Sequence, residues 1–166
     1  MDTSASGHPG VVRVAAALRA AGHLPPPQWL SDSAHTAQQA ADCLGVPLGA
    51  IAKSIVFAVP AGALLCITAG DRRVDVARLP VELGLAGRAD AALVRRHTGF
   101  AIGGVAPLGF APAAGNAPPT VLIDPSLWRF AVVWAAAGHP RAVFPAAPDD
   151  LQRLAGATRH DFTAAD

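Results

Sequence analysis

This chain contains a single lysine and no tyrosine. Of its 13 basic residues only Lys53 is a lysine. Charged residues make up 15% of the sequence, and the formal net charge is +1. This charge excludes the broad basic face of a DNA-binding protein and limits any nucleic-acid contact to a local site.

Cysteine and long apolar runs are also scarce. Cys43 and Cys66 are too few for a disulfide framework or a metal quartet. The six histidines are scattered without ligand spacing, so we expect neither a metal nor another cofactor. The longest apolar run, 130–138, falls short of the roughly 18 residues that a spanning helix needs. Since the N-terminus shows no signal-peptide pattern, we expect a cytoplasmic protein without membrane contact.

The pattern of apolar residues predicts a mixed α+β fold. The length fits one domain over residues 1–166, with residues 1–9 disordered. Caps and helical spacing predict helices over 10–21, 37–44, 76–83, 91–97 and 148–154. Apolar runs predict strands over 28–30, 51–59, 63–68, 120–123, 130–137 and 141–144. Because the connections are of hairpin length, we expect one curved, mainly antiparallel or mixed sheet with helices packed outside it.

Lys53 stands near the start of the apolar run 51–57, which we interpret as a buried strand. Lysine is almost never fully buried without a partner, so this position suggests a functional ammonium group. The alternative is a lysine at a strand end whose side chain reaches water. The neighbouring Ser54 is expected on the opposite face of the strand, which makes a Ser–Lys nucleophile pair geometrically poor.

The second unusual feature is the segment Gly103-Gly104-Val105-Ala106-Pro107. Tandem glycines let the backbone approach a ligand closely, and their N–H groups can bind a carbonyl oxygen or an oxyanion. Pro107 would stiffen such a loop. A β-bulge or a tight corner of the sheet also selects glycine, and the sequence leaves both interpretations open.

Two residues near strand ends, His139 and Asp124, are weaker candidates. In Gly138-His139-Pro140, His139 either faces a pocket or lies in an exposed turn. Asp124 either accepts a hydrogen bond from a substrate or makes an Asx-type turn, and the turn is favoured because Pro125 follows it.

These segments, taken in order, resemble the YbaK/ProX family. Its members are aminoacyl-tRNA deacylases related to the editing domain of bacterial prolyl-tRNA synthetases. The resemblance lies in the helix start 36–39, the strand 51–57 and the segment 69–75. Residues 103–109 resemble the family's Gly-x-x-x-Pro loop, and 121–124, 138–140 and 148–154 fit its later blocks, so the match covers roughly 30–160.

The resemblance implies a curved mixed sheet and hydrolysis of the ester that joins a wrong amino acid to the tRNA 3′ end. Lys53 would contact the terminal phosphate or the aminoacyl carbonyl region, and Gly103 and Gly104 would place N–H groups near that carbonyl. The implied substrate-binding residues are Val105, Pro107, Asp124, Gly138 and His139. Prolyl-tRNA synthetase is an implied partner. The alternative is a module that binds an aminoacyl-adenosine or nucleotide end, or a protein, without turnover.

Overall fold

The computed structural model of the chain describes residues 7–166. The α-helices are α2 (Pro9–Ala20), α3 (Ala37–Leu44), α4 (Ala91–Thr98) and α5 (Pro148–Ala155). The strands are β1 (Gln28–Trp29), β2 (Ile51–Val59), β3 (Gly62–Ala69), β4 (Arg72–Val74), β5 (Gly87–Arg88), β6 (Thr120–Ile123), β7 (Val133–His139), β8 (Ala142–Ala146), β9 (Thr158–Arg159) and β10 (Thr163–Ala165). Short 3-10 helices are η1 (Leu48–Ala50), η2 (Val76–Arg78), η3 (Val81–Leu83) and η4 (Pro125–Arg129).

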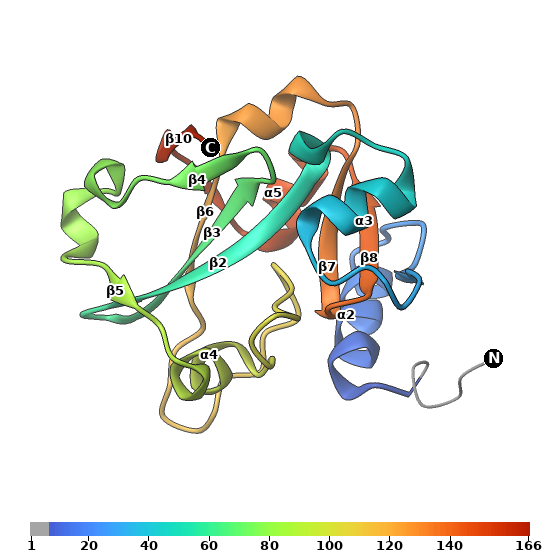
Figure 1. The fold of residues 1–166 in the computed structure, drawn as a ribbon. Helices are drawn as coiled ribbons and strands as arrows, with labels where there is room; N and C mark the ends of the chain where they lie inside the picture. Colours follow the sequence, from blue (N-terminus) through green and yellow to red (C-terminus); the bar gives the residue numbers. More distant parts are fainter. Residues whose placement is uncertain (1–6) are drawn as a thin grey trace.

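One mixed sheet organises the molecule (Figure 1). Its strands follow the order β1-β8-β7-β2-β3-β6-β9, and β5 adds to β2. The β2–β3 and β7–β8 hairpins are antiparallel, whereas β2–β7, β3–β6 and β6–β9 are parallel. The short strands β4 and β10 form a separate antiparallel pair. This arrangement confirms the predicted mixed sheet flanked by helices.

The helices cover the sheet because alternate strand residues face opposite sides. On one side, Ala135 and Phe144 pack with Val14 and Leu18 of α2 in the largest core cluster. On the other side, Trp134 and Val143 pack with α3 in a second cluster. In Figure 1, α2 and α3 accordingly lie on opposite sides of β7 and β8.

The edge of β2 that faces away from β3 is only partly paired. On this edge β2 pairs with β7 at Ile51 and Ala52, and with β5 at Phe57 and Ala58. Within residues 7–166, no strand pairs with 53–56 on this edge. The loop after α4 lies between β2 and β7 in Figure 1. Lys53 therefore sits where two neighbouring strands diverge from β2.

Most predicted element boundaries follow from local chemistry. The capping box of α3 is confirmed, since the Thr36 side chain accepts from the Gln39 N–H and the Gln39 side chain accepts from the Thr36 N–H. Asp90 caps α4, and α3, α4 and α5 each end at a glycine in the left-handed conformation.

Two predicted elements and one predicted disordered segment differ in part from the structure. The expected helix over 76–83 is two 3-10 turns, because Pro80 lacks an N–H and disfavours helical geometry at Leu79. The expected strand over 130–137 begins only at Val133, after η4. Residues 1–6 of the segment predicted to be disordered lie outside the described residues, whereas Pro9 starts α2 and His8 caps it.

Candidate functional site

Two adjacent hollows share Lys53 and Gly103. The larger, of about 380 Å³, is lined by both faces of β2 together with α4 and the following loop, through Lys53, Ser54, Ile55, Val56, Ala89, Val94, Ile102, Gly103 and Val105. The smaller, of about 130 Å³, lies between β2, α3 and the β7–β8 hairpin. The larger hollow reaches both faces because no strand covers this stretch of β2.

Lys53 supplies the formal positive charge of both hollows. Its side chain is half-buried, and the residues that line the two hollows include no carboxylate. Within residues 7–166, Lys53 makes no salt bridge and its ammonium donates no hydrogen bond. An unpaired ammonium beside an apolar lining favours an anionic or strongly polar ligand, because water screens it less than it screens a surface charge.

Ser54 contributes a second unpaired polar group. Its Oγ is buried and has no hydrogen-bond partner among the described residues. Ser54 and Lys53 occupy opposite faces of β2, and both line the larger hollow. The sequence pattern gave Ser54 no binding role. It does not show that residues 53–56 lack a neighbouring strand on one edge, which is what lets one hollow reach both faces of β2.

The glycine loop forms a tight turn beside Lys53. The Gly104 N–H donates to the Ala101 carbonyl at 3.1 Å, and Gly103 has φ +91°, which only glycine adopts readily. The Gly104 N–H is therefore occupied within the turn. Gly103 is an exposed residue and its N–H has no partner within residues 7–166, so of these two amides it is the one free to bind a carbonyl oxygen.

Gly104 has a packing role. A Cβ at this position would lie 3.0 Å from the His139 Cα, 3.2 Å from the His139 N and 3.2 Å from the Pro140 Cδ. The loop thus rests directly on the turn between β7 and β8. The two glycine motifs that the sequence placed about 35 residues apart are in contact, and Pro140 lines the smaller hollow.

His139 itself lies behind the loop and lines neither hollow. Its Nδ1 accepts from the Arg141 N–H at 3.1 Å, and its ring packs against Trp29 and His8. Burial lowers the pKa of His139, and the nearby His8 and Arg141 lower it further. Gly138 is needed for a close approach, since a Cβ there would lie 2.5 Å from the Gly10 carbonyl.

The other predicted site residues divide into two groups. Val105 lines the larger hollow, while Pro107 is buried and lines neither. Asp124 is 1% exposed and also lies outside both linings. Its carboxylate accepts from the Ala69 N–H, the Ser126 N–H and the Ser126 hydroxyl at 3.1, 2.8 and 2.7 Å, so the geometry favours the turn role over substrate binding.

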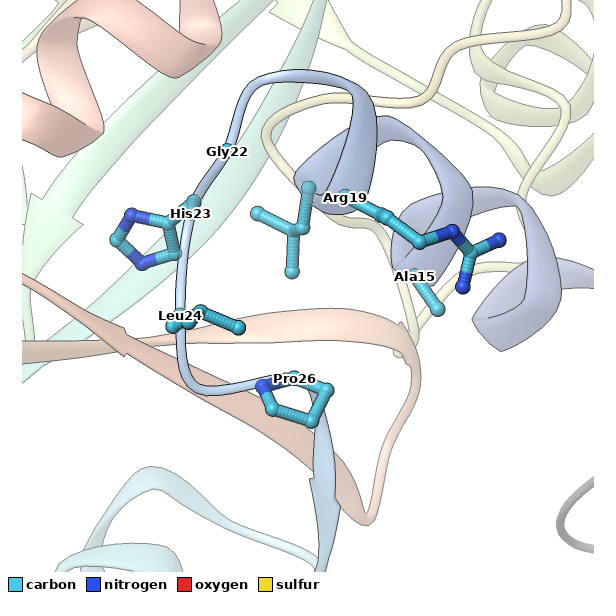
Figure 2. Close-up of a pocket in the computed structure, with 7 residues that line it drawn as sticks. Ala15, Arg19, Gly22, His23, Leu24 and Pro26 are labelled. Atoms are coloured by element: carbon cyan, nitrogen blue, oxygen red, sulfur yellow. The ribbon is translucent and has the colours of Figure 1, made fainter.

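A separate hollow of about 390 Å³ lies at the C-terminal half of α2 (Figure 2). Apolar atoms of Ala15, Leu18, Leu24 and Pro26 form most of it. Its one imidazole, that of His23, already bonds the Pro145 carbonyl at 2.7 Å. We assign no chemistry to this hollow.

Other reactive groups lie elsewhere in the described chain. Burial raises the pKa of the Cys66 thiol to about 12, which makes it a poor nucleophile at neutral pH. Cys43 is exposed on α3 and hydrogen-bonds the Ser31 hydroxyl. Over residues 7–166, no three His, Cys, Asp or Glu side chains group as a metal site would require, and no helix is long and apolar enough to cross a membrane.

Comparison with known proteins identifies the family. The profile of the aminoacyl-tRNA editing domain matches residues 31–154, which include Lys53 and the loop 103–107. The uncharacterized protein YwhH of Bacillus subtilis (strain 168) is 34% identical over 124 residues, covering 74% of this chain and 76% of YwhH.

Solved structures agree with this assignment over nearly the whole chain. The crystal structure of a candidate trans-editing enzyme for prolyl tRNA synthetase is 38% identical, with a TM-score of 0.85 over 95% of this chain and 98% of that one. A protein from a study of epitope backbone grafting onto scaffold proteins is 36% identical, with a TM-score of 0.84 over 95% and 99% of the two chains.

Proposed function

Because the chain belongs to the aminoacyl-tRNA editing domain family, we propose that it is a trans-editing hydrolase that removes a wrongly attached amino acid from tRNA. The reaction is hydrolysis of the ester between the amino acid and the 3′-terminal adenosine. One observation supports this proposal most directly: unpaired Lys53 and the free N–H of Gly103 border the same two hollows.

Lys53 anchors the substrate through its charge. Its ammonium binds the terminal phosphate or the aminoacyl carbonyl region, and the lining brings no carboxylate that would compete. The role needs a charged lysine, and a phosphate nearby favours that form. A Schiff-base role would instead need a carbonyl substrate or a pyridoxal cofactor, and neither lining holds an arginine to bind the phosphate of that cofactor.

The glycine turn stabilises the charge that develops during hydrolysis. Water attacks the ester carbonyl carbon, and the Gly103 N–H donates to the oxyanion. The bond to the 3′ oxygen then breaks, and that oxygen takes up a proton, giving the free amino acid and the 3′ hydroxyl. The neighbouring ribose hydroxyl of the substrate orients the water, which is consistent with the lack of a catalytic triad in the lining. Donors of this kind contribute about 100- to 1000-fold to the rate.

The size of the smaller hollow limits the amino acid. A space of about 130 Å³ between α3 and β2 accommodates a small side chain. One of the structural neighbours is a candidate trans-editing enzyme for prolyl tRNA synthetase. We therefore assign as substrate a tRNA for proline that carries a small wrong amino acid, with prolyl-tRNA synthetase as the functional partner.

A panel of mischarged tRNAs tests the proposal. Wild-type protein should release a small amino acid from at least one of them, measured as loss of the radiolabelled ester. Lys53→Met keeps the length and apolar stem of the side chain but removes the charge, so it should lower kcat/KM at least about 100-fold. Arg73→Met removes an exposed cation that lines neither hollow and should leave the rate within about twofold of wild type. Full activity of Lys53→Met would contradict the anchoring role.

A binding module without turnover is the second candidate. It is favoured by one observation, the absence of a carboxylate from both linings, which leaves no acid–base pair of carboxylate and histidine there. Such a module would bind an aminoacyl-adenosine end, a nucleotide or a protein partner saturably. Release of amino acid by any member of the panel would exclude it.

A further inference from the structure

A third hollow, of about 120 Å³, lies on the other side of the glycine loop. It is lined by His8, Pro9 and Gly10 at the start of α2, by Arg13 and Arg95, and by Gly99, Phe100, Ala101 and Gly138. Ala101 lines this hollow and Ile102 lines the larger hollow beside Lys53, so the loop after α4 borders both spaces.

The formal charges of the residues that line this hollow are all positive. Arg13 and Arg95 contribute two guanidinium groups, and no carboxylate lines the space. Neither arginine forms a salt bridge within residues 7–166. Neither arginine has a carboxylate among its neighbours in sequence, since residues 3–31 and 91–123 contain no aspartate or glutamate. Although the net charge of the whole chain is only +1, these two segments carry basic residues and no acidic ones.

The guanidinium of Arg13 is fixed in place. Its Nε and Nη2 donate to the carbonyls of Gly109 and Gly99 at 3.2 and 3.0 Å, and it lies 4.7 Å over the centre of the Phe100 ring. Its Nη1 has no partner within the described chain. A guanidinium held this way loses little conformational entropy when it binds a phosphate.

His8 adds an imidazole N–H donor. Its Nδ1 accepts from the Gly10 N–H at 3.2 Å, which leaves the ring proton on Nε2. The hollow therefore offers the fixed guanidinium of Arg13, the exposed guanidinium of Arg95 and an imidazole, which together suit a phosphate group.

We propose that this hollow, formed by Arg13, Arg95 and His8, is a second anion site that binds a backbone phosphate of the tRNA acceptor end while Lys53 holds the terminal nucleotide. The inference rests on the proposed function, since it concerns the same substrate. It assigns the loop 99–103 as the element over which the RNA strand passes from one site to the other.

Salt-dependent binding of an uncharged acceptor-stem RNA minihelix tests the second site without requiring turnover. Fluorescence anisotropy should show a linear fall of log K with log salt concentration. Arg95→Gln should weaken binding roughly tenfold at low salt and reduce the slope by about 1, as expected for one lost phosphate contact. Arg95 is exposed and unpaired, so this variant should fold normally.

Arg96→Gln is the matched control. Arg96 is also exposed, lies in the same last turn of α4 and carries the same charge, but does not line the hollow. It should keep the wild-type slope. Equal slopes for Arg95→Gln and Arg96→Gln, or no binding of the minihelix by wild type, would overturn the second site.

Two substrates separate this inference from the proposed function. A mischarged minihelix carries backbone phosphates, whereas an aminoacyl-adenosine carries none. Arg95→Gln should raise KM about tenfold for the first and leave the second unchanged. Hydrolysis of both substrates with no effect of Arg95→Gln would remove the second site and keep the hydrolase. Salt-dependent binding without hydrolysis of any mischarged substrate would keep the site and remove the hydrolase.

Discussion

Lys53 carries a charge that the described fold leaves unneutralised. Four arginines of the described chain pair with carboxylates, and among them Arg129 donates two hydrogen bonds of 2.9 and 2.7 Å to Asp71. That pair raises the pKa of Arg129 and lowers the pKa of Asp71, because each charge stabilises the other. An ammonium without such a partner leaves its electrostatic interaction available to a ligand.

Ser54 allows a prediction in which stability and activity change in opposite directions. Its buried Oγ has no partner, and a buried unsatisfied hydroxyl costs about 1 kcal/mol or more. Ser54→Ala should therefore raise the free energy of unfolding by about 1 kcal/mol, measured by urea denaturation. If the hydroxyl bonds substrate in the larger hollow, kcat/KM should fall roughly tenfold in the same variant.

The matched control for Ser54 is Ser126→Ala. The Ser126 hydroxyl donates to the buried carboxylate of Asp124 at 2.7 Å, so its loss should lower the free energy of unfolding. A fall in stability for Ser54→Ala like that of Ser126→Ala would show that its Oγ has a structural partner.

At the scale of elements, the loop after α4 takes its position from the β7–β8 turn. The contact depends on Gly104, because any Cβ there would press on backbone atoms of His139, which cannot move away as a flexible side chain can. Loop and turn therefore act as one unit that places the Gly103 N–H beside Lys53.

Gly104→Ala should displace this loop. Overpacking of this kind costs about 2 kcal/mol, which should lower Tm by several degrees. Because Gly103 moves with the loop, kcat should fall at least about tenfold. Gly87→Ala is the control, since a Cβ there meets nothing within 4 Å. Its Tm and kcat should stay near wild type, and similar losses in both variants would contradict the docking role of Gly104.

At the scale of the whole molecule, His139 makes the free energy of unfolding depend on pH. Its folded pKa lies below the ordinary value of 6.5, owing first to burial and then to His8 and Arg141. Below pH 6.5 the unfolded chain therefore binds a proton that the folded chain resists. The free energy of unfolding should be highest above pH 6.5 and should fall as the pH drops through the lowered folded pKa.

His139→Asn tests this dependence. The asparagine Oδ1 can replace Nδ1 as acceptor for the Arg141 N–H, and the asparagine side chain does not titrate. Urea unfolding from pH 7.5 to 5.0 should show a shallower loss of stability than in wild type. Parallel curves for the two proteins would show that His139 does not contribute to the pH dependence.

Most helices, the longer strands and the family could be predicted from the order of residues along the chain. Features that depend on residues close in sequence could be predicted. They include the capping box at Thr36, the glycines that end α3 and α4, and the β2–β3 hairpin. Composition alone singled out Lys53, and the resemblance of its strand and of the loop 103–107 to the editing family is confirmed.

The contacts between these parts depend on the three-dimensional fold. The short strands β4, β5, β9 and β10 carry too few residues to form a periodic pattern, and each exists because a distant strand pairs with it. The same holds for the unpaired edge of β2, the contact of Gly104 with His139, and the third hollow shared by Arg13 and Arg95. Such features depend on separations of tens of residues, which the spacing of residue types along the chain does not encode.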